Sequence, residues 1–119
     1  MQLYRQMRKG STPVLVLSLL AEQPMYGYQI ALELEQRSEG YFTMKEGLLY
    51  PALHQMEQDG LLNSEWRTAA GARRRKYYFI TEKGHKVLAN SVAEWRTFTE
   101  KLMRVIGGGD HVEPEVIPG

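Results

Sequence analysis

The segment KEGLLYPALHQMEQDG, residues 45–60, decides which fold this chain adopts. Its apolar residues recur at the spacing that lines up one face of an α-helix, and they are Leu49, Ala52, Leu53 and Met56. Pro51 lies among them, although a proline inside a helix costs roughly 3 kcal/mol because it leaves the carbonyl four residues earlier unpaired. That carbonyl belongs to Gly47, and both residues fall opposite Leu49 on a helical wheel, where water can reach it. The sequence therefore predicts a helix whose outer face is short of side chains at Gly47 and Pro51 and can lie close to another molecule.

Two further helices are predicted before this segment. In GSTPVLVLSLLAEQ, Ser11 and Thr12 suit the N-cap and Pro13 suits the first helical position. The first helix should therefore run from Pro13 to about residue 22. The second should follow Pro24 in PMYGYQIALELEQRSEG, with a narrow apolar stripe on one face, and end at Gly40 as its C-cap.

The elements around and after the helix at residues 45–60 also carry sequence signals. Thr43 is followed three residues later by Glu46, which predicts a capping box at the start of that helix, and Gly60 should end it. Next, LLNSEWRT and RKYYFIT are rich in aromatic and β-branched residues and flank AAGAR, which predicts a hairpin with Gly71 at its tip. Thr81 suits the N-cap of a last helix that continues to about residue 106.

The last helix carries an apolar seam with alternating spacings of four and three residues. The seam consists of Leu88, Val92, Trp95, Thr99, Leu102 and Ile106. This heptad pattern is typical of helices that pair, so residues 81–106 are predicted to form a dimerisation helix, with packing inside the chain covering only its first turns. Residues 107–119, GGGDHVEPEVIPG, have the glycine, proline and acid content of a disordered tail.

Charge is distributed unevenly along the chain, whose net charge is only +1. Residues 107–119 contain three acids and no Lys or Arg, so residues 1–106 carry 15 basic against 11 acidic residues, a net charge of +4. The basic residues gather at the N-terminus and around the predicted hairpin, namely Arg5, Arg8, Lys9, Arg67, Arg73, Arg74, Arg75 and Lys76. Such clusters indicate a local anionic partner, with a solvated loop as the alternative.

The composition argues against several other classes of protein. The absence of cysteine excludes disulfides, thiol catalysis and cysteine-bound zinc, and it suits a reducing cytosol. The apolar run PVLVLSLLA is too short to span a membrane. The three histidines are scattered, and neither a nucleophile elbow nor a phosphate-binding glycine loop occurs in the sequence. We therefore expect a cytoplasmic protein of one domain-sized unit that is not an enzyme and uses no metal or cofactor.

The order of the predicted elements is that of a winged helix-turn-helix domain followed by a dimerisation helix. The predicted fold class is mainly α with a small β-hairpin, divided into a DNA-binding domain at residues 1–80, a dimerisation helix at 81–106 and a tail at 107–119. In this fold the third helix enters the major groove of double-stranded DNA, a dimer reads two half-sites of an inverted repeat, and the basic wing reaches phosphates or the minor groove.

Residue chemistry then selects the side chains that face DNA. Glutamine and histidine address base edges, so His54 and Gln55 are the expected base contacts, while tyrosine hydroxyls and cations more often bind phosphate. For Tyr28, an equally favoured alternative packs it with Tyr26 against the first helix. The expected DNA-contacting residues are Tyr28, Lys45, Tyr50, His54, Gln55, Arg73, Arg74, Arg75 and Lys76.

Three segments resemble signatures of the PadR family of transcriptional regulators: YGYQI at 26–30, GLLYPALHQMEQDGLL at 47–62 and RRKYYFITEKG at 74–84. The similarity spans about residues 11–84, and the single long C-terminal helix resembles the small subfamily. The resemblance implies a homodimeric winged-helix repressor that is released by a small hydrophobic or phenolic effector in a multidrug or detoxification response. Leu48 and Phe79 depart from the family pattern. A winged-helix module that binds protein through its basic wing, without a ligand response, is the alternative.

Trp95 has two open interpretations near the middle of the last helix. A two-fold axis there would bring two tryptophans together, and filling the core of the interface is the commoner role of such a residue. Small members of the PadR family are known for ligand sites in this region, which implies instead a pore for flat hydrophobic cations or phenols. Val92 and Phe98 would then be its neighbours, and Glu94 is the nearest acid for a cationic ligand.

Overall fold

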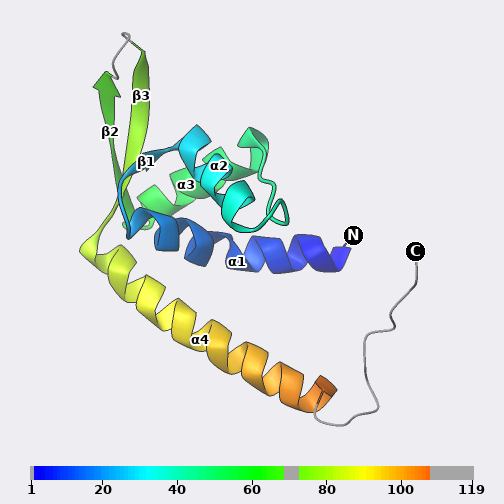
Figure 1. Cartoon of the computed structure of the whole chain (residues 1–119). Helices are drawn as coiled ribbons and strands as arrows, with labels where there is room; N and C mark the ends of the chain where they lie inside the picture. The colour runs from blue at the N-terminus through cyan, green and yellow to red at the C-terminus, as the bar shows by residue number, and fades with distance from the viewer. Residues whose placement is uncertain (1, 69–72, 108–119) are drawn as a thin grey trace, which may run out of the picture.

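The computed structural model describes residues 2–68 and 73–107. Within these ranges the chain forms four α-helices and a three-stranded antiparallel sheet (Figure 1). The elements are α1 (Gln2–Leu20), β1 (Met25–Tyr26), α2 (Gly27–Arg37), α3 (Glu46–Gln58), β2 (Leu62–Thr68), β3 (Arg74–Ile80) and α4 (Glu82–Gly107). The predicted fold class, mainly α with a small β part, is confirmed. The predicted hairpin tip at Gly71 and the predicted disordered tail beyond residue 107 lie outside the described residues.

The hydrophobic core lies where α1, α2 and α3 meet one face of the sheet. Its largest fully buried side chains come from all of these elements and include Leu17, Ile30, Leu49, Leu53 and Leu62. Burying such a side chain stabilises the fold by roughly 1.5–3 kcal/mol. The apolar face predicted for residues 45–60 is therefore the face by which α3 packs on the core.

Helix α1 begins at Gln2, so the predicted start at Pro13 was wrong. Pro13 lies inside the helix, and the hydroxyls before it bond backward instead of capping: Thr12 Oγ1 donates to the Arg8 carbonyl at 2.7 Å and Ser11 Oγ to the same carbonyl at 3.2 Å. Serine and threonine can bond the carbonyl three or four residues earlier within a helix as well as cap a new one. Residue type alone therefore could not distinguish a helix start from a continuing helix.

The sheet contains a short first strand that the sequence did not predict. Residues after Pro24 were expected to be helical, but Met25 and Tyr26 form β1 and pair with Tyr78 and Tyr77 of β3. Strand order is therefore β1-β3-β2, with β3 in the centre. Two residues are too few to show the alternation by which a strand is recognised, so only the tertiary pairing defines β1.

Helix α2 ends at Arg37 and is followed by a Schellman-type turn. The amide of Gly40 donates to the Glu35 carbonyl at 2.7 Å, and positive φ angles occur at Glu39 (54°) and Gly40 (83°). The predicted stop at Gly40 is confirmed as part of this turn, although the C-cap itself is Ser38.

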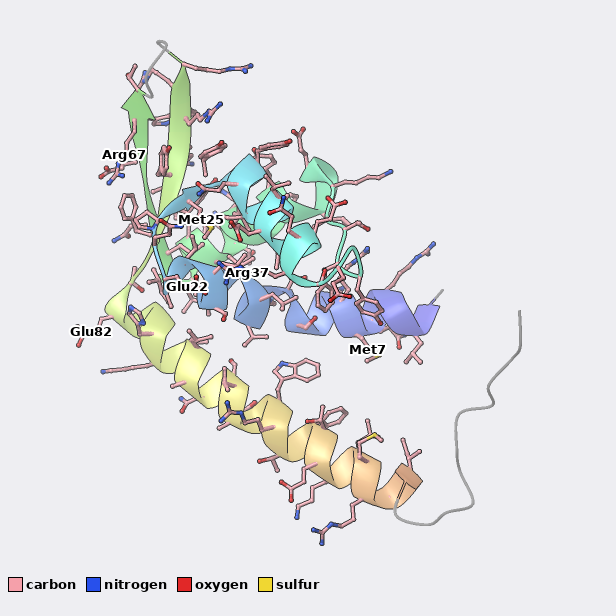
Figure 2. The ribbon with its side chains drawn as sticks, viewed as in Figure 1. Met7, Glu22, Met25, Arg37, Arg67 and Glu82 are labelled. Atoms are coloured by element: carbon pink, nitrogen blue, oxygen red, sulfur yellow. The ribbon has the colours of Figure 1, made fainter. Side chains whose placement is uncertain are left out.

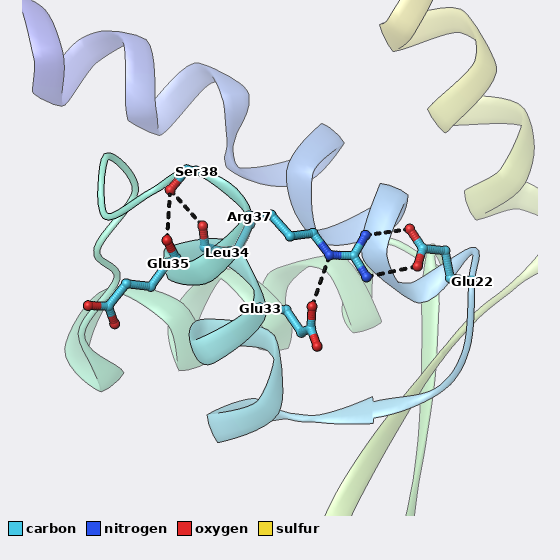
Figure 3. A network of polar contacts seen from close by, with 6 residues as sticks. All are labelled: Glu22, Glu33, Leu34, Glu35, Arg37 and Ser38. Carbon is cyan, nitrogen blue, oxygen red and sulfur yellow. Dashed lines mark hydrogen bonds and ion pairs between the residues drawn. The ribbon is translucent and has the colours of Figure 1, made fainter.

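Arg37 ties the end of α2 to the segment that follows α1. Its guanidinium donates to both carboxylate oxygens of Glu22, at 2.5 and 2.8 Å, and to Glu33 at 2.9 Å (Figure 3). These hydrogen bonds hold the pKa of Glu22 below its ordinary value. Bidentate contacts of this kind fix geometry as well as adding energy, so they orient α2 relative to α1.

Helix α3 begins at Glu46, with Lys45 at the N-cap and no side-chain cap bond, so the predicted capping box from Thr43 was wrong. Met44 is buried in the core, and Lys45 is extended (φ −76°, ψ 158°), which delays the helix beyond the reach of Thr43. The predicted end is confirmed: Asp59 is the C-cap and Gly60 has a φ of 79°.

Helix α4 begins as predicted, because Thr81 Oγ1 accepts a hydrogen bond from the amide of Gly84 at 3.0 Å. The helix runs to Gly107 and leaves the rest of the molecule at a wide angle (Figure 1). Val87 and Leu88 pack against the core, and the Trp95 ring lies next to Gly10 of α1. Packing within the chain thus reaches Trp95, further along the seam than predicted.

The second half of α4 keeps several large apolar side chains exposed. They are Phe98, Leu102, Met103, Val105 and Ile106. The N-terminal half of α1 adds Leu3 and Met7, and Figure 1 shows both helix ends extending beyond the core on the same side. No described helix has the length and apolarity needed to cross a membrane.

Candidate nucleic-acid interface

The face of α3 that points away from the core is exposed along its length. Its residues are Gly47, Pro51, His54 and Gln58. Open space surrounds the position that a Cβ atom would take at Gly47. The outward face predicted from the helical wheel is confirmed, and the strip formed by Gly47 and Pro51 carries few side-chain atoms.

Tyr50 connects this face to α2. Its ring lies directly on Gly27, where an added Cβ would stand 2.6 Å from the tyrosine hydroxyl oxygen. The side chain is still 42% exposed. A groove of about 490 Å³ beside it runs between α2 and α3 and is also lined by Tyr28 and Lys45. Three of the predicted DNA-contacting residues therefore share one groove.

The exposure of Tyr28 argues against its alternative packing against α1, while Tyr26 is half-buried. Tyr28 is 64% exposed at the start of α2. Tyr26 lies in β1, where its ring meets that of Tyr77 edge to face at 5.5 Å between centroids. Tyr28 is thus free of the core and available to a partner.

We predict that Gly27→Ala weakens DNA binding without unfolding the chain. The three atoms nearest to the added methyl group all belong to the far end of the Tyr50 side chain, which can swing outward, so the substitution displaces the tyrosine hydroxyl. Operator affinity should drop roughly tenfold, the scale of one lost hydrogen bond to a charged group. Fluorescence anisotropy with labelled operator measures the change, and Tyr50→Phe is the matched control that should give a similar loss. Wild-type affinity in both variants would show that the Tyr50 hydroxyl does not contact DNA.

A second groove, of about 410 Å³, lies between α3 and the hairpin. Tyr50 lines it as well, together with three cations of β3, which are Arg74, Arg75 and Lys76. The arginines lie over aromatic rings: Arg74 is 5.4 Å from the Trp66 centroid and Arg75 is 4.3 Å from that of Tyr26. Tyr50 therefore joins the α2–α3 groove and the hairpin groove into one surface.

One hairpin residue outside the predicted site, Trp66, contributes to this region, whereas Arg67 does not. Trp66 is 57% exposed and lines the hairpin groove, with Lys76 as its cross-strand partner. Arg67 lies on the other side of the hairpin, away from α2 and α3 (Figure 2), over the rings of Tyr77 and Phe79 at 5.2 and 4.8 Å. Pairing the two predicted strands residue by residue would have placed Trp66 beside Lys76, and that signal was available in the sequence.

The remaining predicted DNA contacts do not line either of these two grooves. His54 is exposed on α3 one turn beyond Tyr50. Gln55 donates a hydrogen bond to Asp59 at 3.0 Å and lines a groove that faces the N-terminal half of α1. Arg73 is exposed immediately before β3. Contact of these three side chains with DNA stays a prediction.

Tyr78 is buried beneath the hairpin groove, between β3 and α3. Burial raises the pKa of Tyr78 above its ordinary value of 10.0, and the negative charges of Glu57 and of an ionised Tyr50 act in the same direction. The phenol is therefore held neutral over a wider pH range than in the unfolded chain.

This raised pKa predicts an alkaline dependence of stability. The contribution of Tyr78 is fully present below pH 10 and is lost as the pH rises through the higher pKa of the folded state, because the unfolded chain releases the proton first. Urea unfolding between pH 9 and pH 11 should show a steeper loss for the wild type than for Tyr78→Phe, which keeps the ring. If stability falls equally with pH in the two proteins, Tyr78 does not cause the alkaline dependence.

The region expected to bind an effector forms a groove of about 450 Å³ between α1 and α4. Trp95 and Phe98 line it with Glu94 and with Pro13 and Val14 of α1. The two aromatic rings meet edge to face at 5.9 Å between centroids. Val92 is half-buried and does not line this groove.

The comparison with known proteins agrees with this arrangement of helices, wing and grooves. Residues 16–90 match the family described as Transcriptional regulator PadR-like family. The chain belongs to this family. The resemblance of its sequence to the PadR regulators is thereby confirmed. As a member of the PadR family, the chain is a DNA-binding transcriptional regulator and not an enzyme.

Individual relatives of this PadR-family chain cover most of its length. It is 31% identical over 107 residues to the transcriptional regulator Rv3488 of Mycobacterium tuberculosis, spanning 90% of this chain and 94% of that protein. A PadR-family transcriptional regulator from Eggerthella lenta shares its fold with a TM-score of 0.76 and 33% identity over 87% of this chain and 88% of that one. A PadR-like regulator from Bacillus cereus gives a TM-score of 0.77 at 27% identity, over 87% and 99% of the two chains.

Proposed function

We propose that this PadR-family chain is a homodimeric repressor that binds an inverted-repeat operator and is released by a small hydrophobic or phenolic effector. One observation supports the DNA-binding surface most strongly. Tyr50 lines both the α2–α3 groove and the hairpin groove, so one surface holds six of the nine predicted contacts. They are Tyr28, Lys45, Tyr50, Arg74, Arg75 and Lys76. Reader helix and wing can then contact one stretch of DNA together.

The homodimer is supported by the apolar side chains that the single chain leaves exposed. Leu102 and Ile106 continue the predicted seam of α4, and Phe98 and Met103 extend it. Monomeric proteins rarely expose contiguous apolar patches of this kind, and a heptad seam is typical of paired helices. A two-fold axis across α4 would place two copies of α3 on half-sites one helical turn, roughly 34 Å, apart.

The effector response is supported by the groove between α1 and α4. Its aromatic pair, Trp95 and Phe98, suits a flat ring, and Glu94 suits a cationic group on the ligand. Because α1 also packs in the DNA-binding domain, a ligand wedged between α1 and α4 would alter the angle between the two reader helices of a dimer. Repression by blocking the promoter follows from the family resemblance.

Three measurements test this function. Operator DNA from the region upstream of the gene should bind at least about 1,000-fold more tightly than random DNA. The double variant Leu102→Glu, Ile106→Glu should sediment as a monomer in ultracentrifugation. In a Trp66→Phe background, a panel of phenols, dyes and cationic drugs should quench Trp95 fluorescence and release DNA.

Each part of the proposal fails on its own result. Equal affinity for upstream and random DNA would overturn sequence-specific regulation. A double variant that stays dimeric would remove the seam from the interface. Absence of quenching across the panel would reject the effector site while leaving the DNA-binding function in place.

A further inference from the structure

Glu57 occupies an unexpected position on α3, because it is an acid beside the DNA-binding surface. Its carboxylate accepts a hydrogen bond from Ser64 Oγ of β2 at 2.5 Å. The other carboxylate oxygen lies 3.7 Å from the ammonium of Lys76 in β3. The two side chains of this ion pair are 31% and 36% exposed. Glu57 therefore joins the reader helix to both strands of the wing.

This contact separates Lys76 from the other cations of the wing. Arg74 and Arg75 lie over aromatic rings, where a guanidinium keeps its charge and its outward N–H groups for a phosphate. Lys76 instead has a carboxylate as its neighbour, although its ammonium also lies 5.7 Å from the ring of Tyr78. A phosphate must compete with Glu57 for Lys76.

We infer that Glu57 is a positioning residue that sets the sequence specificity of DNA binding. Its hydrogen bond with Ser64 holds the wing against α3, and its ion pair with Lys76 competes with DNA phosphates for that ammonium. The inference rests on the DNA-binding surface proposed above.

The two effects act differently on operator and random DNA. Withholding one cation removes a phosphate contact from any DNA, and random DNA depends almost entirely on such contacts for its binding. Binding to the operator also needs α3 in the major groove and the wing on the backbone at the same time. A hydrogen bond between a carboxylate and a hydroxyl is charge-assisted and short, which holds these two elements at one relative position.

Three variants test the two effects separately. Glu57→Gln removes the charge and keeps the shape, so the slope of log affinity against log salt should steepen by about 0.9 per chain as Lys76 binds a phosphate. The ratio of operator to random affinity should fall at the same time. Ser64→Ala leaves the charge in place, so it should lower that ratio without changing the salt slope. In Glu57→Gln, Lys76→Gln the slope should return to the wild-type value.

The outcomes distinguish this inference from the surface on which it rests. Circular dichroism confirms that each variant is folded before binding is measured. If Glu57→Gln keeps both the wild-type salt slope and the wild-type ratio of operator to random affinity, the inferred role of Glu57 is wrong. The double variant Arg74→Gln, Arg75→Gln tests the surface itself: if it binds DNA like the wild type, the wing does not contact DNA and both proposals fail. Weakened binding in that variant with no effect of Glu57→Gln rejects only the inference about Glu57.

Discussion

Replacing the four wing cations, Arg73, Arg74, Arg75 and Lys76, with glutamine is expected to weaken operator binding roughly 100- to 1,000-fold at 0.15 M salt. Each cation that neutralises a phosphate contributes about 0.9 to the slope of log affinity against log salt. Because Lys76 is paired with Glu57, three to four cations per chain take part, and the slope should fall by about 2.7–3.6 per chain of the proposed dimer. Anisotropy titrations from 50 to 300 mM salt measure both quantities.

A control that removes cations outside the wing distinguishes the effect of the wing from that of the net charge, compared per charge removed. The second half of α4 does not offer four exposed cations, but Lys101→Gln, Arg104→Gln removes two from it, and this end of α4 points away from the hairpin (Figure 1). This control should leave the salt slope close to that of the wild type. An equal loss of slope per charge at both places would mean that DNA responds to net charge and not to the wing.

Gly84→Ala is expected to produce the largest loss of stability. A Cβ atom at this position would lie 2.4 Å from the Leu61 carbonyl oxygen and 2.7 Å from Ile80 Cγ1. The first neighbour is backbone and cannot rotate away, so the start of α4 must move from the loop after α3. Overpacking of this kind costs about 1–3 kcal/mol, and more when backbone shifts, which corresponds to several degrees in Tm for a domain of this size.

Gly47→Ala is the matched control, because nothing lies within 4 Å of the added atom. Alanine is the better helix former by about 1 kcal/mol, so this variant should unfold at a slightly higher temperature than the wild type. Thermal unfolding at one fixed protein concentration compares the two, since dimerisation makes Tm depend on concentration. A Tm for Gly84→Ala within one degree of the wild type would show that the contact with Leu61 is not as tight as the structure has it.

The elements that were predicted correctly are those whose own residues show a local pattern, such as an apolar face, a cap or strand composition. The helix at residues 45–60 showed a complete apolar face, a glycine stop at Gly60 and an outward strip at Gly47 and Pro51, and all three are present in the structure. The hairpin and the start of α4 at Thr81 were equally clear, because strand composition and an N-cap are local properties.

The errors lie where a local signal has two meanings or is absent. Ser11, Thr12 and Pro13 have the composition of a helix start, yet they lie inside α1 with both hydroxyls bonded to the Arg8 carbonyl. The strand β1 exists only through its pairing with β3. Burial of Met44, a tertiary effect, moved the start of α3 away from Thr43.

The candidate site divides in the same way. Residues on the outward face of α3 and on the wing followed from periodicity and charge, so the sequence could propose Tyr50 and the cations of β3. Contacts between elements could not be derived, since they depend on how α2, α3 and the hairpin pack together. The packing of the Tyr50 ring on Gly27 and the hydrogen bond between Ser64 and Glu57 are contacts between elements, so the sequence could not predict them.

Site-directed cleavage of DNA tests the central claim that α3 and the wing face the operator. The chain contains no cysteine, so a single cysteine at Gln58, on the outward face of α3, can carry an iron–EDTA group, with a cysteine at Lys101 of α4 as the control. On the upstream operator the Gln58 label should cut each half-site, giving two centres of cleavage about 34 Å apart, and the Lys101 label should cut weakly or not at all. Equal cleavage by both labels, or none from the Gln58 label on DNA that is demonstrably bound, would contradict the account.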